Sequence, residues 1–137
     1  PIVPVKTDGA FVHPALIDMS AASNVADEEL FGPLLQVYRA KDFDAAIDKA
    51  NDTRFGLSGG LVSENADLWE QARLRMKAGI LNWNKPTTGA ASSLPFGGPG
   101  LSGNFRPGAY YAADYCAWPQ AGQVAKTPSS PPMVGIK

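Results

Sequence analysis

The chain has 137 residues, and 45% of them are hydrophobic, so its size and composition are those of one globular domain that can bury a core. Its net charge of −1 argues against a nucleic-acid partner or an anionic membrane surface. No apolar run approaches the roughly 20 residues that span a bilayer. The single cysteine, Cys116, excludes an internal disulfide and is compatible with a cytoplasmic location.

The N-terminal 20 residues alternate short apolar pieces with proline and glycine, which predicts one or two short strands. They begin Pro1-Ile2-Val3-Pro4, without an initiator methionine and without a charged and then apolar leader. We therefore expect the chain to be a piece of a longer polypeptide.

Residues 34–62 predict a strand, a helix and a second strand. The apolar run 34–38 is typical of a buried strand. Over 42–51 the apolar residues recur at helical spacing on one face, and Asp42 is the expected N-cap. Residues 57–62 then return to a strand pattern.

A second helix is predicted to start at the N-cap Asn65 and to run to about Lys77. Gly79 fits the position just beyond its end, where a left-handed backbone favours glycine. A third strand follows at 80–83. The order strand–helix–strand–helix–strand over 34–83 predicts an α/β fold built on a parallel layer.

The C-terminal third is less regular. Residues 85–107 lose all periodicity and are rich in glycine, serine, threonine and proline, and such long loops are functional or disordered. A short helix is predicted over 109–115 and a strand over 116–124. The tail from residue 126 is expected to be flexible.

Two motifs could carry chemistry. In residues 28–33 (EELFGP), the carboxylate of Glu29 could accept hydrogen bonds from ribose hydroxyls while Phe31 packs on a flat heterocycle. The alternative is an acidic turn with Phe31 simply buried. In residues 87–93 (TTGAASS), which follow the end of a strand, accessible backbone N–H groups could bind a carboxylate. The alternative there is a flexible linker.

Other candidate sites are weaker. Residues 98–103 match the spacing G-x-G-x-x-G, but no convincing strand precedes them and Pro107 prevents a helix after them, so we expect no nucleotide-phosphate site. His13 is the only histidine and has no neighbouring ligand, so no metal site is predicted. Cys116 lies among bulky apolar residues, where a thiol is usually buried and inert.

Five blocks in order resemble the NAD(P)-dependent aldehyde dehydrogenase family: residues 11–16, 28–33, 50–58, 79–82 and 95–103. The resemblance runs from about residue 9 to residue 124. It implies that residues 1–114 are the C-terminal part of a three-layer, parallel-sheet catalytic domain. Residues 115–125 would form an oligomerisation strand that pairs with another subunit, and 126–137 a flexible tail.

The resemblance also assigns site residues. Glu29 matches the family glutamate that hydrogen-bonds the nicotinamide ribose, and Phe31 the aromatic near the nicotinamide. Phe96 matches a ring that lines the aldehyde tunnel. Gly89 and Ala90 are similar to an anchor loop whose backbone N–H groups hold a substrate carboxylate. Residues 82–92 and 110–119 resemble the branch that oxidises a dicarboxylate-bearing semialdehyde in arginine catabolism.

The family's cysteine nucleophile, general-base glutamate, asparagine oxyanion donor and Rossmann-type cofactor domain would all lie before Pro1. We therefore assign no catalytic residue here and expect the isolated chain to be inactive and to bind no cofactor. Its expected partners are the missing N-terminal part, further copies of the subunit, and, in the complete enzyme, NAD or NADP with a carboxylated aldehyde. The alternatives are a non-catalytic binding or scaffold module of the same fold, and an unrelated α/β enzyme that uses Cys116.

Overall fold

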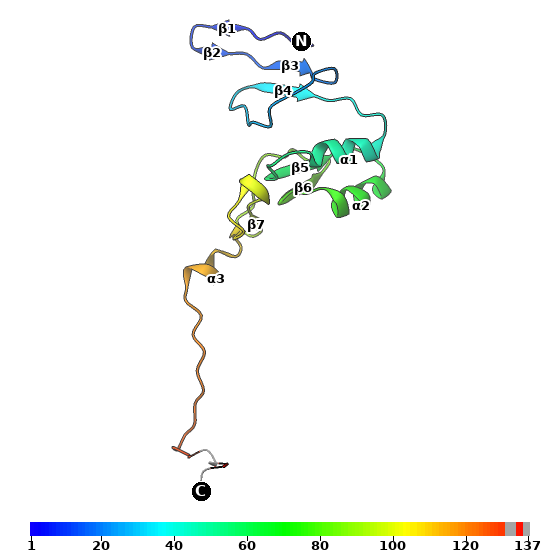
Figure 1. Ribbon diagram of the computed structural model, residues 1–137. Coiled ribbons are helices and arrows are strands. Elements are labelled where there is room, and N and C mark those ends of the chain that lie inside the picture. Colours follow the sequence, from blue (N-terminus) through cyan, green and yellow to red (C-terminus); the bar gives the residue numbers. More distant parts are fainter. Residues whose placement is uncertain (131–133, 136–137) are drawn as a thin grey trace.

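The computed structural model describes residues 1–130 and 134–135 (Figure 1). Within them the strands are β1 Thr7–Asp8, β2 Phe11–Val12, β3 Ala15–Asp18, β4 Leu34–Val37, β5 Ser58–Leu61, β6 Ile80–Trp83, β7 Pro95–Phe96 and β8 Gly108–Ala109. The helices are α1 Phe43–Asn51, α2 Ala66–Arg75, the 3-10 turn Gly100–Ser102 and α3 Ala112–Cys116. These strands form four separate two-stranded sheets.

The centre of the fold is a strand–helix–strand unit, as the sequence predicted. Strands β5 and β6 are parallel, with Ser58 opposite Ile80, and α2 connects them. The indole rings of Trp69 in α2 and Trp83 in β6 stack with centroids 5.5 Å apart. Trp83 Nε1 also donates a hydrogen bond of 2.8 Å to the Ser63 carbonyl. The helix is thereby fixed to the strand that follows it.

Helix α1 lies beside α2, and both predicted N-caps are confirmed. Asp42 accepts a backbone N–H bond in the first turn of α1, and Asn65 accepts two in α2. Arg75 Nη1 lies 2.6 Å from Asp44 Oδ1 and joins the two helices. Asn51, the last residue of α1, donates from Nδ2 to the Arg75 carbonyl at 2.9 Å and accepts from the Lys77 N–H at 2.8 Å. Asn51 therefore closes the end of α2.

The prediction that 34–83 forms one parallel layer is wrong in one respect, because β4 pairs with β3 and not with β5. Both pairs are parallel. After the β3–β4 sheet, Arg39 Nε donates to Asp18 Oδ2 at 3.0 Å. Hydrogen bonds from Ser20, through its hydroxyl and its backbone N–H, together with that from Arg39, lower the pKa of Asp18 to about 2.

The predicted role of Gly79 as the left-handed residue after α2 is also wrong. The helix ends at Arg75, and the backbone of the next residue, Met76, is already extended, with φ −74° and ψ 132°. Gly79 is instead a point of close approach, because a Cβ there would overlap the Gly97 carbonyl. Its N–H donates to the Gly56 carbonyl at 2.9 Å. The glycine is required for packing between distant segments and not for a helix cap.

The short helix predicted over 109–115 is found one to three residues later, as α3. The predicted strand over 116–124 is absent from the chain itself, because α3 continues to Cys116 and residues 117–130 have no regular structure and run away from the rest (Figure 1). A strand needs a hydrogen-bonded neighbour, and this segment has none within the described residues. Pairing with another subunit stays a prediction. The predicted tail 126–137 includes residues 131–133 and 136–137, which lie outside the described residues.

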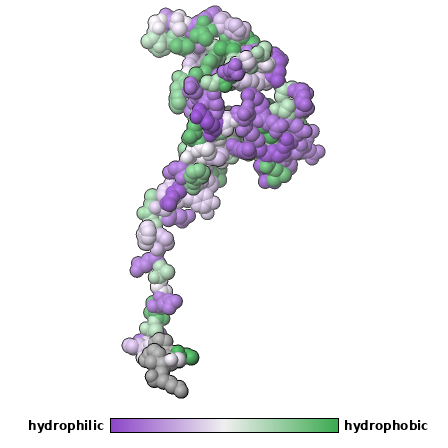
Figure 2. Space-filling model, viewed as in Figure 1, coloured by the Kyte–Doolittle hydropathy of each residue, from purple (hydrophilic) through white to green (hydrophobic). Residues whose placement is uncertain are grey.

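The expectation that the chain buries a core of its own is wrong. Its accessible surface is 11494 Å², whereas a compact monomer of 14.5 kDa exposes about 6,900 Å². Among the described residues, the buried hydrophobic ones are Ala15, Ile47 and Ala72. Hydrophobic side chains instead appear on the surface, notably over the N-terminal strands (Figure 2). No described helix is long and apolar enough to cross a membrane.

The contacts of Asn51 predict a stability effect. Asn51→Ala in the intact protein removes both hydrogen bonds at the end of α2 and leaves the Arg75 carbonyl and the Lys77 N–H without this partner. We expect a loss of about 1–2 kcal/mol in the free energy of unfolding, measured by urea denaturation. Asn104→Ala is the matched control, since Asn104 makes one exposed local contact, to the Arg106 N–H. Equal stability of the two variants would contradict the assigned role of Asn51.

Candidate functional site

Glu29 lies on the segment that leads into β4 and lines an open groove. The other walls of this groove come from the loop between α1 and β5, the end of α2, and the 3-10 turn; the lining includes Asp27, Gly56, Ser58, Met76, Lys77, Leu101 and Ser102. The Glu29 side chain is exposed, and it forms no hydrogen bond or ion pair with another described residue. Its carboxylate is therefore available to accept hydrogen bonds from a ligand.

The segment that carries Glu29 is attached to the α1–β5 loop through Asp27. The Thr53 hydroxyl donates to Asp27 Oδ1 at 2.7 Å. The Arg54 N–H and Nε donate to Oδ2 at 2.7 and 3.3 Å, and Arg54 Nη2 donates to the Asp27 carbonyl at 2.7 Å. The Thr53 bond first, and then the bonds from Arg54, lower the pKa of Asp27. We call Asp27, Thr53 and Arg54 the Asp27 network.

The same loop holds the segment that contains the G-x-G-x-x-G spacing. The Leu101 N–H donates to the Arg54 carbonyl at 2.9 Å, and the Gly56 N–H donates to Ser102 Oγ at 2.9 Å. The short turn Gly100–Ser102 therefore packs on the loop and does not open a long helix. These glycines allow close packing, because a Cβ at Gly98, Gly100 or Gly103 would overlap a neighbouring backbone carbonyl.

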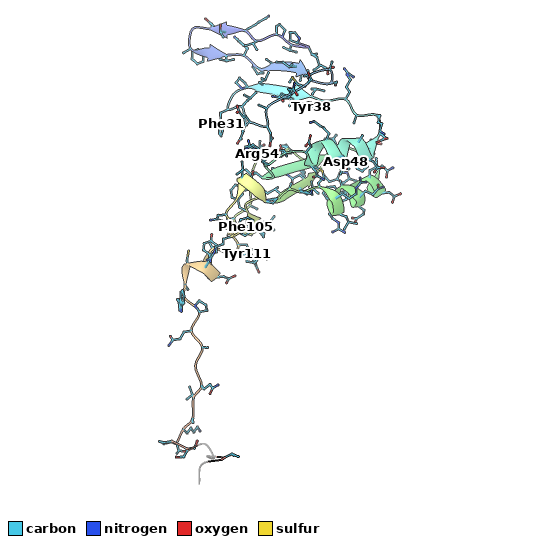
Figure 3. The ribbon with its side chains drawn as sticks, viewed as in Figure 1. Phe31, Tyr38, Asp48, Arg54, Phe105 and Tyr111 are labelled. Carbon is cyan, nitrogen blue, oxygen red and sulfur yellow. The ribbon has the colours of Figure 1, made fainter. Side chains whose placement is uncertain are left out.

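Phe31 is 93% exposed, so the alternative that it is simply buried is wrong. Its ring lies on the segment before β4, and Arg54 lies on the loop that leads to β5 (Figure 3). The pair Glu29 and Phe31 is open to a ligand or to another segment of protein.

Phe96 is 43% exposed and lines a second groove. This groove is formed mainly by residues 95–107 and includes Gly79. Leu101 and Ser102 line both grooves, so the two adjoin. Glu29 and Phe96 therefore lie on neighbouring grooves that share one wall.

Gly89 and Ala90 lie on an exposed loop that does not line either groove. Its first part is fixed, because Asn82 Nδ2 donates to the Pro86 carbonyl at 2.6 Å and Ser58 Oγ donates to the Thr87 carbonyl at 2.8 Å. Gly89 has a φ of +90°, and a Cβ there would meet nothing within 4 Å. The loop is thus attached to both strands of the central unit but open beyond Thr87.

The remaining candidates do not join a site. Cys116 is exposed at the end of α3, so the prediction that it is buried is wrong. In the described part of the chain, no group of three or more histidine, cysteine, aspartate or glutamate residues could hold a metal ion.

Sequence reasoning missed the Asp27 network. The block 50–58 was recognised as a motif, but nothing in the spacing shows that its threonine and arginine bond a carboxylate 26 or 27 residues earlier. The one available signal was a hydrogen-bonding aspartate directly before the EELFGP motif.

The chain is similar to known proteins over most of its length. A family model described as the aldehyde dehydrogenase family matches residues 3–120. An N-succinylglutamate 5-semialdehyde dehydrogenase from Burkholderia cenocepacia (strain HI2424) is 59% identical over 111 residues, which is 81% of this chain and 23% of the relative. The enzyme of the same name from Legionella pneumophila (strain Corby) is 60% identical over 110 residues, which is 80% of this chain and 22% of that relative. The chain thus spans less than a quarter of these relatives.

Solved structures give the same result. A 1-pyrroline-5-carboxylate dehydrogenase from Thermus with bound NAD superposes with a TM-score of 0.70 and 39% identity, over 80% of this chain and 21% of that one. Aldehyde dehydrogenase 21 from Physcomitrella patens, in complex with the reaction product succinate, also superposes with a TM-score of 0.70. Its sequence identity is 32%, and the match covers 80% of this chain and 23% of that one. These similarities confirm the resemblance and the α/β fold class predicted from the sequence, and the chain belongs to the aldehyde dehydrogenase family.

Proposed function

We propose that this chain is the C-terminal part of the catalytic domain of an NAD(P)-dependent dehydrogenase that oxidises N-succinylglutamate 5-semialdehyde to N-succinylglutamate, in arginine catabolism. The observation that carries the proposal is the 59% identity to enzymes of that name over 81% of the chain. That stretch is long enough to include both grooves. The matched stretch is only 23% of the relative, so the remainder of the enzyme would supply what this chain lacks.

Glu29 in the first groove and Phe31, two residues later in the chain, fit a pyridine nucleotide. The Glu29 carboxylate is exposed and accepts no hydrogen bond within the described chain, as a group that binds ribose hydroxyls requires. The exposed Phe31 ring offers a flat apolar surface for the nicotinamide. When bound, NAD or NADP accepts the electron pair and proton that leave the aldehyde carbon. Glu29 and Phe31 would hold that cofactor and orient it.

The substrate side fits an aldehyde that carries carboxylates. Phe96, half exposed on the adjoining groove, would line the channel to the reacting carbon and exclude water from it. Backbone N–H groups of Gly89 and Ala90 would hold a substrate carboxylate, for which the open loop leaves room. A simple alkyl aldehyde would leave those donors without a partner.

The reacting groups belong to the rest of the enzyme in this proposal. A cysteine thiolate, a general-base glutamate and an asparagine oxyanion donor would form and hydrolyse the thioester, so no residue of this chain is catalytic and the isolated chain is inactive. The segment 115–125 would pair with another subunit in a homo-oligomer, and we place the enzyme in the cytoplasm.

The full-length protein tests the proposal directly. We expect it to reduce NAD or NADP with N-succinylglutamate 5-semialdehyde, and to prefer that aldehyde to an unsubstituted alkyl aldehyde in kcat/KM. The 137-residue chain alone should show no turnover under the same conditions. A full-length protein that binds the semialdehyde without oxidising it would favour the alternative of a binding module.

Glu29→Gln in the full-length enzyme is expected to weaken cofactor use by roughly tenfold in KM or kcat, because the neutral amide replaces a charged acceptor at the ribose hydroxyls. Steady-state kinetics with varied cofactor measure the change. Glu64→Gln, at an exposed position outside both grooves, is the control. Wild-type kinetics for Glu29→Gln would remove the ribose-binding role.

Gly89→Pro is expected to raise KM for the carboxylated aldehyde by about one to two orders of magnitude. Proline lacks the N–H donor, and its ring cannot adopt the φ of +90° found here. Gly9→Pro is a matched control, since Gly9 also has a positive φ and open space around it, at the turn between β1 and β2. An unchanged KM for Gly89→Pro would exclude the anchor role of this loop.

A further inference from the structure

Asp27 precedes Glu29 by two residues and is the most strongly bonded side chain of that segment. Its two carboxylate oxygens accept from one hydroxyl, one backbone N–H and one guanidinium N–H, and its carbonyl accepts from the same guanidinium. Glu29, in contrast, has no partner of its own within the described residues. Two residues span at most about 7 Å, so the place of Asp27 limits where the Glu29 backbone can lie.

The partners of Asp27 are themselves fixed. The Arg54 carbonyl accepts from the Leu101 N–H at 2.9 Å, and Gly56, two residues on, bonds Ser102 and Gly79. The loop is therefore attached to the 3-10 turn and to the start of β6. A displacement of Asp27 would detach the Glu29 segment from the α1–β5 loop, because no other side-chain hydrogen bond joins described residues 21–33 to that loop.

We propose that Asp27 is a positioning residue that holds the Glu29 carboxylate at the cofactor ribose through Thr53 and Arg54. This rests on the proposed function, in which Glu29 binds the cofactor. An exposed ion pair alone contributes little. The network differs because it includes a hydroxyl and a backbone N–H, whose directions fix the carboxylate plane. The lowered pKa of Asp27 agrees with this bonding of its ionised form.

The test is the affinity of the full-length enzyme for its pyridine nucleotide, measured by calorimetry without aldehyde. Asp27→Asn keeps the shape of the side chain but removes its charge and one of its two acceptor oxygens, so it cannot accept the bonds from both Thr53 and Arg54. We expect the Kd for the nucleotide to rise roughly three- to tenfold, with KM for the aldehyde unchanged. Thr53→Val, which removes the hydroxyl that donates to Asp27 and accepts from the Phe55 N–H, should shift the same Kd in the same direction by a smaller factor.

Asp18→Asn is the matched control, because Asp18 is also bonded to a serine and an arginine but lies at the end of β3 and does not line the groove that contains Glu29. It should leave the nucleotide Kd unchanged. In the Glu29→Gln background, Asp27→Asn should have no further effect, since there is no carboxylate left to position.

The outcomes separate the two proposals. If Glu29→Gln weakens nucleotide binding but Asp27→Asn and Thr53→Val do not, or if the effects of Asp27→Asn and Glu29→Gln multiply, the positioning role is wrong and the ribose contact stands. If Glu29→Gln itself leaves the Kd unchanged, both roles fail. A protein that binds the nucleotide as expected but does not oxidise the semialdehyde contradicts only the proposed substrate.

Discussion

The loop between α1 and β5 is the constraint on which the rest of the site depends. Within a few residues it bonds Asp27 ahead of the Glu29 motif, Leu101 and Ser102 in the 3-10 turn, and Gly79 at the start of β6. Each of these segments is far away in the sequence and has little regular structure of its own. Because each of these segments is joined to the loop by at least one bond that involves a backbone group, the loop fixes the course of the chain there.

The large accessible surface of this chain follows from the small size of its sheets. Each sheet of the described chain has two strands, and a two-stranded sheet is marginal in water unless other elements cover it. Helices α1 and α2 cover the central pair, whereas the β3–β4 pair leaves Leu35 63% exposed. In the relative from Burkholderia cenocepacia the matched stretch is only 23% of the chain, so most of that protein lies outside this stretch. The exposed Phe31 and the unpaired Glu29 fit the same explanation, since they lie where a further layer or a ligand would be added.

Local features were predictable and pairings between distant segments were not. Asp42 and Asn65 were identified as N-caps because a cap involves only the next three residues. The pairing of β4 with β3, the close approach of Gly79 to Gly97, and the bonds of Asp27 all join residues 18 or more positions apart. Composition and spacing carry no record of such partners. For the site, the motifs located Glu29 and Phe31, but the groove that joins Glu29 to Ser102 became visible only in the fold.

The loop that carries Gly89 and Ala90 lies outside both grooves and is fixed at its base. Ser58 and Asn82 attach residues 86 and 87 to the neighbouring strands β5 and β6, so the base of the loop is set by the central unit. Beyond that base the chain makes few contacts, and an anchor for a substrate carboxylate needs a defined arrangement of N–H groups. For the anchor role proposed above, such order would have to come from the bound carboxylate or from protein packed against the loop. The backbone of Gly89 has a positive φ, which it adopts without the steric cost that a side chain would add.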